Sequence, residues 1–309
     1  MNIKTKEKDK NKNRILILIL ILLLLFGLAF LYIWKNKQSM PDENADLPIY
    51  AKGTFEYNDV LYKQKSNTNT LLLSASYDDK ADFIMLLVID NINKEILPIQ
   101  IKRSTMCDYT KLDEFGKIKD KVYERIDDSY SYGNDPLSSL INLKDAVSNL
   151  LCNVRIDYYL GIDLKDAENI MENLDNVEVV LRDDYIGLEK EHKSGEKIVV
   201  YKDNISKFVI GTSDEDIDTI EDRQALFLSS LILQYQDKEK SSAGYTAKAF
   251  NQISNYCIFN SNDIVTLINK FVNYKILNRI SYNGSYEDLK YYPNIYSVID
   301  LCLNNIYEK

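Results

Sequence analysis

Residues 81–105 read ADFIMLLVIDNINKEILPIQIKRST. The segment FIMLLVI (residues 83–89) is a short continuous apolar run, which is typical of a strand buried on both faces. The polar residues DNINK predict a turn, and EILPIQI (residues 95–101) predicts the partner strand. Asp82 precedes the first strand, and Arg103 and Ser104 follow the second. The stretch therefore predicts a buried hairpin with charged and polar residues at its two ends.

Strands and helices alternate in the chain that follows this hairpin. Further strands are predicted at IDYYLGI (residues 156–162) and VEVVL (residues 177–181). Apolar residues at helical spacing predict helices over the following segments: 137–151, the segment capped by Asp163, 223–234, one opened by Ser261 or Asp263, and a last one begun by Pro293. This alternation predicts an α/β protein, a three-layer α/β/α sandwich with a mixed central sheet.

The N-terminal region predicts one transmembrane helix in front of this domain. Residues 15–34 are ILILILILLLLFGLAFLYIW, a run without charge that would span about 30 Å as a helix. Lysines and an arginine precede it, so the N-terminus is expected in the cytoplasm and the C-terminal domain outside the cell. A cleaved signal peptide is the alternative, but the apolar run exceeds the usual 7–15 residues and no small-x-small cleavage site follows.

The expected organisation has four parts. A basic cytoplasmic tail occupies residues 1–14, and the membrane helix occupies residues 15–34. Residues 35–74 form an extracellular linker with short strands, and residues 75–309 form the main domain. The expected location is thus the cell membrane, crossed once.

The uneven charge argues against nucleic acid as a partner. Residues 1–37 hold eight of the 38 Lys and Arg residues and two of the 47 Asp and Glu residues. The rest of the chain therefore has 30 cationic and 45 anionic residues, a net charge of −15. Phosphate backbones need a basic surface, which this domain lacks.

Cysteine and histidine usage limits the chemistry. The four cysteines show no CxxC spacing, which argues against a zinc site, and both disulfides and free thiols stay open for Cys107, Cys152, Cys257 and Cys302. The only histidine, His192, lies in a polar segment and is expected on the surface. A single histidine excludes histidine-based triads, so any chemistry must use Asp, Glu, Arg or a bound cation.

Four segments in order resemble signatures of one family. The first is residues 81–105, which resemble a family signature made of an aspartate, a hairpin and a strand that ends in a sequence like IPRDT. The second is RIDDSYSYGND (125–135) with IDYYLGIDL (156–164), and the third is IMENLDNVEVV (170–180). The fourth is GEKIVVYKDNI with DIDTIEDRQALFL (216–228), similar to GEQALAYVRxR and DFGRIERQQxFL. Over residues 75–309, behind a membrane helix, the chain resembles the LytR-CpsA-Psr family of Gram-positive cell-envelope proteins.

This resemblance implies an activity and a set of partners. Enzymes of the family transfer glycopolymers such as wall teichoic acid or capsule from a polyprenyl-pyrophosphate carrier to peptidoglycan. Arginines and a divalent metal, Mg²⁺, would neutralise the pyrophosphate leaving group, and an apolar tunnel would hold the lipid. By correspondence, Asp82 would bind the metal with Ser104 at the second ligand position. The catalytic residues would be Arg103, Arg125 and Arg223 at the pyrophosphate, with Gln224 orienting it.

The chain also departs from the family pattern. Ser104 replaces an aspartate, Asp203 and Ile205 stand at the two arginines of VRxR, and Ile220 stands at the arginine of GRIERQ. Lys202 or Lys207 would substitute in part. Because each lost charge-stabilising donor typically costs on the order of 100-fold, weakened transfer is expected. Two alternatives stay open, a non-catalytic protein that binds the lipid-linked glycan or acts as a scaffold, and an envelope-linked regulator.

Overall fold

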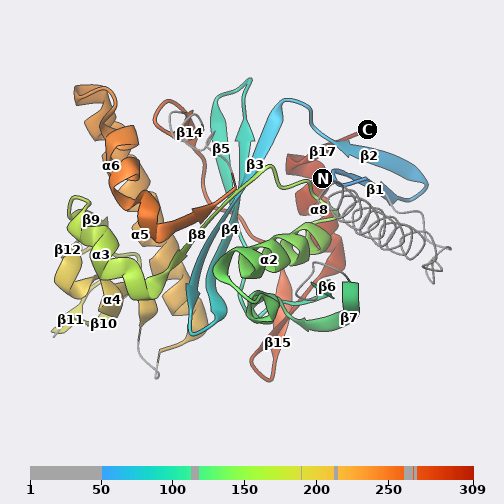
Figure 1. Ribbon diagram of the computed structural model, residues 1–309, viewed down its shortest axis with the longest axis horizontal. Coiled ribbons are helices and arrows are strands. Elements are labelled where there is room, and N and C mark those ends of the chain that lie inside the picture. Colours follow the sequence, from blue (N-terminus) through green and yellow to red (C-terminus); the bar gives the residue numbers. More distant parts are fainter. Residues whose placement is uncertain (1–50, 113–117, 189, 212–214, 261–266, 268–269) are drawn as a thin grey trace, which may run out of the picture. The chain divides into compact units, whose positions relative to one another are not determined.

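The computed structural model describes residues 51–309 apart from 113–117, 189, 212–214, 261–266 and 268–269 (Figure 1). Residues 50–309 form one compact unit. The predicted membrane helix lies outside the described residues, as does the start of the helix predicted from Ser261 or Asp263, of which residues 267, 270 and 271 are described and helical. None of the described helices is both long enough and apolar enough to cross a bilayer.

A mixed six-stranded sheet forms the centre of this unit, as the sequence predicts. Its strands, in spatial order, are β13 (Cys257–Phe259), β8 (Tyr158–Asp163), β3 (Thr68–Tyr77), β4 (Lys80–Asp90), β5 (Glu95–Gln100) and β14 (Lys275–Ile276). The predicted hairpin is the antiparallel pair of β4 and β5. β3 pairs with β8 in parallel, and β14 pairs with β5 in parallel.

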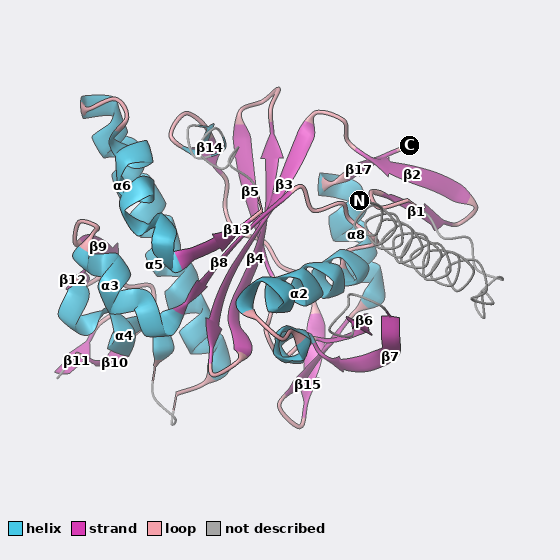
Figure 2. Cartoon of the chain, viewed as in Figure 1, coloured by secondary structure: helices cyan, strands magenta, loops and turns pink. Residues whose placement is uncertain are grey.

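Helices cover both faces of this sheet (Figures 1 and 2). One face carries α3 (Ala167–Glu172) with the short η2 (Leu164–Asp166), α4 (Lys202–Ile210), α5 (Ile217–Ser241) and α6 (Tyr245–Ile253), which η3 (Ser254–Tyr256) follows. The other face carries η1 (Ile126–Tyr132), α2 (Pro136–Leu150) and α8 (Ile295–Asn305). The two faces are called the α5 face and the α2 face below.

Smaller sheets surround this centre. They are β1 (Thr54–Tyr57) with β2 (Val60–Gln64) and β17 (Tyr307–Glu308), β6 (Met106–Leu112) with β7 (Ile118–Arg125), β9 (Val177–Val180) with β12 (Lys197–Val200), β10 (Tyr185–Gly187) with β11 (Lys190–His192), and β15 (Gly284–Glu287) with β16 (Lys290–Pro293). The predicted strand VEVVL is therefore β9, which pairs with β12 and does not enter the central sheet.

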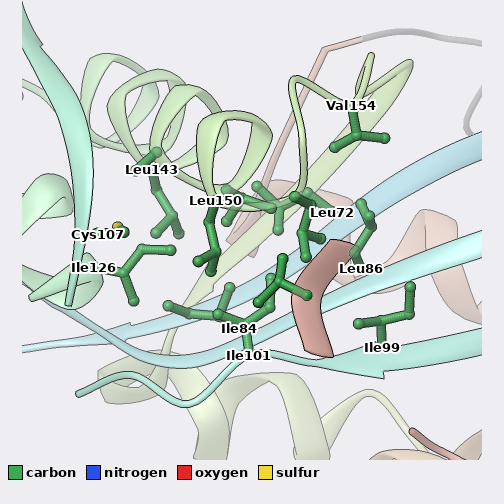
Figure 3. Packing of buried hydrophobic residues seen from close by; sticks show 14 of the residues in the cluster. Leu72, Ile84, Leu86, Ile99, Ile101, Cys107, Ile126, Leu143, Leu150 and Val154 are labelled. Atoms are coloured by element: carbon green, nitrogen blue, oxygen red, sulfur yellow. The ribbon is translucent and has the colours of Figure 1, made fainter. Parts of the chain in front are cut away.

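The continuous apolar run of β4 is explained by burial on both faces. Ile84 and Leu86 belong to the cluster on the α2 face together with Leu143 and Leu150 of α2, and Figure 3 shows Ile84 beside Leu150 and Leu86 beside Leu72. Phe83, Met85 and Leu87 alternate with them and belong to the cluster on the α5 face. Each fully buried side chain of this size stabilises the fold by about 1.5–3 kcal/mol.

Two local expectations were wrong. Pro293 does not begin the last helix, because it ends β16, and Asn294 caps α8 by accepting hydrogen bonds from the amides of Tyr296 and Ser297 at 3.0 and 3.3 Å. His192 is not a surface residue. It is only 6% exposed, and its Nδ1 lies 2.9 Å from an oxygen of Glu196.

The four cysteines are all free thiols, and those of Cys107 and Cys302 are buried.

Candidate active site

Asp82 occupies an irregular position in β4. Ala75 of β3 pairs with Phe83, and the next residue, Ser76, pairs with Ala81, so Asp82 is the extra residue of a β-bulge. Regular alternation would place Asp82 on the α2 face with Ile84, but its carboxylate contacts Gln224 of α5 instead. Bulges commonly re-aim a side chain in this way beside active sites.

Asp82 holds two of the residues that the resemblance singles out. Its Oδ1 forms an ion pair with Nη1 of Arg103, and its Oδ2 accepts a hydrogen bond of 2.6 Å from Nε2 of Gln224. The same Gln224 nitrogen donates to the carbonyl of Val209 at 2.7 Å, and Gln224 Oε1 is buried without a partner among the described residues. Asp82, Arg103 and Gln224 thus meet in one cluster, built from β4, the turn that follows β5, and α5.

Arg103 is the centre of this cluster. Its amide donates to Oε1 of Glu221 at 2.8 Å, and its carbonyl accepts from the amide of Asp127 at 3.2 Å. Burial lowers the pKa of Arg103, while the negative charges of Glu221 and Asp127 oppose this effect. Its Nε is buried and has no hydrogen-bond partner among the residues described.

Arg125 lies beside Arg103 but is paired with its own carboxylate. Its Nε and Nη2 donate to the two oxygens of Asp127 at 3.0 and 2.5 Å. Burial raises the pKa of Asp127, and the charge of Arg125 opposes that shift. The positive charge of Arg125 also contributes to lowering the pKa of Arg103.

Arg223 is directed elsewhere. Its Nη1 and Nη2 donate to the two carboxylate oxygens of Glu215 at 2.6 and 3.0 Å, and its Nε donates to the carbonyl of Phe208. The guanidinium carbon also lies 4.5 Å from the ring centroid of Tyr185. Arg223 therefore joins α5 to α4 and β10, and a phosphate would reach it only after displacing Glu215.

Ser104 is fully buried, and its carbonyl accepts from the amide of Tyr291 at 3.0 Å. Because both oxygens of Asp82 are already engaged and a serine hydroxyl carries no charge, these side chains fit Mg²⁺ poorly. Within the described ranges, no three His, Cys, Asp or Glu side chains gather as a metal site.

Lys202, one of the two lysines expected to substitute for the missing arginines, is already paired with a carboxylate. Lys202 forms an ion pair of 2.9 Å with Glu172. Asp203 is exposed in the first turn of α4, whereas Ile205 and Ile220 are buried. The apolar side chain of Ile205 instead contributes to the wall of a cavity.

Two adjoining apolar cavities of about 190 Å³ each lie between the sheet and the helices of the α5 face. Leucines of the strands and of α5 line both, and the residues that the two cavities share are Leu73, Leu160, Leu174, Leu228, Leu231 and Ile253. Gln224 and Val209 line the second cavity. The apolar space therefore reaches the cluster of Asp82, Arg103 and Gln224.

Glu221 is the site residue that sequence reasoning missed. It is 3% exposed, and its Oε1 accepts a hydrogen bond from the amide of Arg103. The sequence contains one indication of its position. Glu221 precedes Gln224 by three residues, so the two side chains lie on the same face of a helix.

The fold is that of the LytR-CpsA-Psr proteins. B. subtilis TagU is similar over 77% of this chain and 94% of its own, with a TM-score of 0.56 and 16% identity. B. subtilis TagV covers 77% and 95%, with a TM-score of 0.58 and 15% identity. TagT bound to LI-WTA covers 77% and 88%, with a TM-score of 0.57 and 16% identity. No model of a protein family and no curated protein sequence matches the chain.

Proposed function

We propose that this protein is a divergent LytR-CpsA-Psr protein of a Gram-positive cell envelope. It binds a polyprenyl-pyrophosphate-linked glycopolymer at the outer face of the membrane and transfers the polymer slowly to peptidoglycan. The observation that carries this proposal is the apolar space that ends at Gln224, whose amide is bonded to the Asp82–Arg103 ion pair. A lipid tail needs such an apolar space, and the pyrophosphate at its end needs a cation.

Slow transfer is proposed because the cations near the cavity are already neutralised. The guanidinium of Arg103 pairs with Asp82, and that of Arg125 pairs with Asp127. Each of these two cations already has a carboxylate partner, so a pyrophosphate would have to displace at least one of them. This displacement costs free energy, whereas a preorganised site needs no such rearrangement. No step is assigned to Mg²⁺, because the side chains present fit it poorly.

The membrane location follows from residues 15–34 and from the ligand. A polyprenyl carrier resides in the bilayer, and an anchored domain stays within reach of it. In intact cells, protease added from outside should remove residues 50–309 while the N-terminal segment stays protected. Protection of the whole chain would reverse the proposed topology.

Binding of the lipid tests the proposal most simply. The full-length protein in nanodiscs should bind a polyprenyl phosphate, and Leu228→Trp should weaken this binding at least 10-fold because Leu228 lines both apolar cavities. Leu233→Trp is the matched control, since Leu233 lies on the same helix and is 53% exposed. Binding that is absent, or that both variants leave unchanged, would exclude the cavity as the lipid site.

The non-catalytic alternative differs in one result. A protein that binds the lipid but never releases polyprenyl phosphate from a lipid-pyrophosphate-linked glycan would be a binding or scaffold homologue. The ion pairs of Arg103 with Asp82 and of Arg125 with Asp127 favour this alternative. Transfer is favoured by Nε of Arg103, which has no hydrogen-bond partner among the described residues and could still donate to a phosphate oxygen.

A further inference from the structure

A second, polar pocket of about 230 Å³ lies next to the cluster of Asp82, Arg103 and Gln224. Its walls come from the end of β5, the first turns of α5 and residues 279–281. Lys102 forms an ion pair of 2.6 Å with Asp218, and Arg279 forms one of 2.6 Å with Asp222. Glu221 forms part of the wall between this pocket and Arg103.

One face of α5 connects the two spaces. Leu231, Leu228 and Gln224 line the apolar cavity, and Glu221 and Asp218 line the polar pocket. These five residues follow one another at spacings of three or four, so they lie along one side of the helix. At 1.5 Å per residue, about 15 Å separate Glu221 from Leu231, with Gln224 between them. The apolar cavity and the polar pocket thus lie on opposite sides of Gln224 and its partner Asp82.

This order fits the two sides of an in-line displacement at phosphorus. A lipid tail in the apolar cavity directs the leaving polyprenyl phosphate toward Gln224. The attacking oxygen must then approach from the opposite side, which is the side of the polar pocket. Both donors and acceptors line this pocket, and the exposed ring of Tyr286 lies 5.0 Å from Nζ of Lys102 at its edge. Such a lining suits a neutral, hydroxyl-rich ligand.

We propose that the polar pocket binds the sugar that accepts the polymer, and that Glu221 takes the proton from its attacking hydroxyl. The proposal rests on the proposed function and names its acceptor site. The acceptor oxygen forms a bond to the glycan-side phosphorus while its proton passes to Oε2 of Glu221. The bond from that phosphorus to the bridging oxygen breaks, and its electron pair leaves on polyprenyl phosphate. Glu221 then returns the proton to solvent.

The position of Glu221 supports this role. Its Oε1 is held by the amide of Arg103 at 2.8 Å, and the residue is 3% exposed and lines the polar pocket. Burial raises the pKa of Glu221 to about 7, and the charges of Arg103, Asp218 and Lys102 also act on it. A proton acceptor works best with a pKa near the operating pH. In the GRIERQ segment that the chain resembles, the corresponding residue is isoleucine.

The first test replaces the carboxylate. Full-length protein in nanodiscs is given a synthetic lipid-pyrophosphate-linked disaccharide and soluble peptidoglycan chains, and released polyprenyl phosphate is measured between pH 5.5 and 8.5. Wild-type release should rise as the pH passes about 7, and Glu221→Gln should lower the rate at pH 8 about 100-fold and abolish this rise. Asp237→Asn, an exposed carboxylate on the same helix, should change neither.

The second test fills the pocket without touching Glu221. Ser281 is an exposed residue of its wall, so Ser281→Phe should raise the KM for the peptidoglycan chains at least 5-fold and leave polyprenyl phosphate binding unchanged. If the lipid binds and is released but neither variant differs from wild type, the acceptor site is wrong and the proposed function stands. Lipid binding without any release also overturns the acceptor site. Absence of lipid binding overturns the proposed function itself.

Discussion

Asp82, near the start of β4, forms an ion pair with Arg103, which lies three residues after the end of β5, and the pair depends on a β-bulge. Asp82 is the extra residue of that bulge, which turns its carboxylate toward α5. Gln224 completes the contact from α5. Gln224 lines the apolar cavity, so these three residues connect that cavity with the polar side chains of the site.

Removing the carboxylate of this pair should destabilise the protein. Asp82→Ala leaves the buried guanidinium of Arg103 without its ion-pair partner, and we expect the free energy of unfolding to fall by about 3 kcal/mol. Urea unfolding monitored by circular dichroism measures this change. The control is Asp237→Ala, whose ion pair with Lys240 is exposed and should contribute less than about 1 kcal/mol. Equal effects of the two substitutions would contradict a structural role for the buried pair.

Glu221 should make stability depend on pH. Its folded pKa of about 7 lies above the unfolded value of 4.5, so the folded state binds the proton more tightly. The resulting stabilisation is complete below pH 4.5 and is lost as the pH rises to about 7, a change of about 3 kcal/mol. Urea unfolding across this range should therefore show a smaller loss of stability for Glu221→Gln than for wild type. Parallel curves for the two proteins would mean that the carboxylate is not buried.

Arg223 should behave as a residue that joins helices. Both of its terminal nitrogens bind Glu215, and lysine cannot reproduce this two-pronged contact. We expect Arg223→Lys to lower the free energy of unfolding by about 2 kcal/mol while polyprenyl phosphate binding changes less than 2-fold. A large loss of lipid binding with unchanged stability would instead place Arg223 at the phosphate.

Ser104→Asp restores the acidic residue of the family pattern at a fully buried position. A buried carboxylate without a partner is costly, so the variant should melt at a lower temperature than wild type in the absence of divalent ions. If position 104 and Asp82 share a metal site, millimolar Mg²⁺ should recover most of this loss and leave wild type unchanged. A variant that Mg²⁺ fails to stabilise would exclude a shared site.

The sequence predicted the parts of the fold that depend on local patterns. The apolar run of residues 83–89, the turn after it and the helix at 137–151 all appear, because burial on both faces and capping by Asp135 act over a few residues. The sequence could not place β9 outside the central sheet, because a short apolar strand reads the same in either sheet. It also could not show that His192 is buried, since Glu196 and the ring of Tyr185 reach it only in the folded chain.

The candidate site was predictable in part for a similar reason. The resemblance named Asp82, Arg103 and Gln224, which the structure brings together. The direction of the Arg223 side chain could not be predicted from the motif. Arg223 and Gln224 point about 100° apart on the helix, and Arg223 points away from the site because it binds Glu215. Glu221 went unnoticed because its role depends on an amide that lies 118 residues away in the sequence.

Photocrosslinking with a polyprenyl phosphate tests the central claim most directly. Full-length protein in lipid vesicles is irradiated with a probe that carries a diazirine along its prenyl chain, and the adducts are located by mass spectrometry. We expect adducts on the residues that line the apolar cavities, in particular Leu228 and Leu231 of α5, and competition by unlabelled polyprenyl phosphate. Adducts confined to residues 15–34 or scattered over the exposed surface would contradict a lipid-binding cavity in this domain.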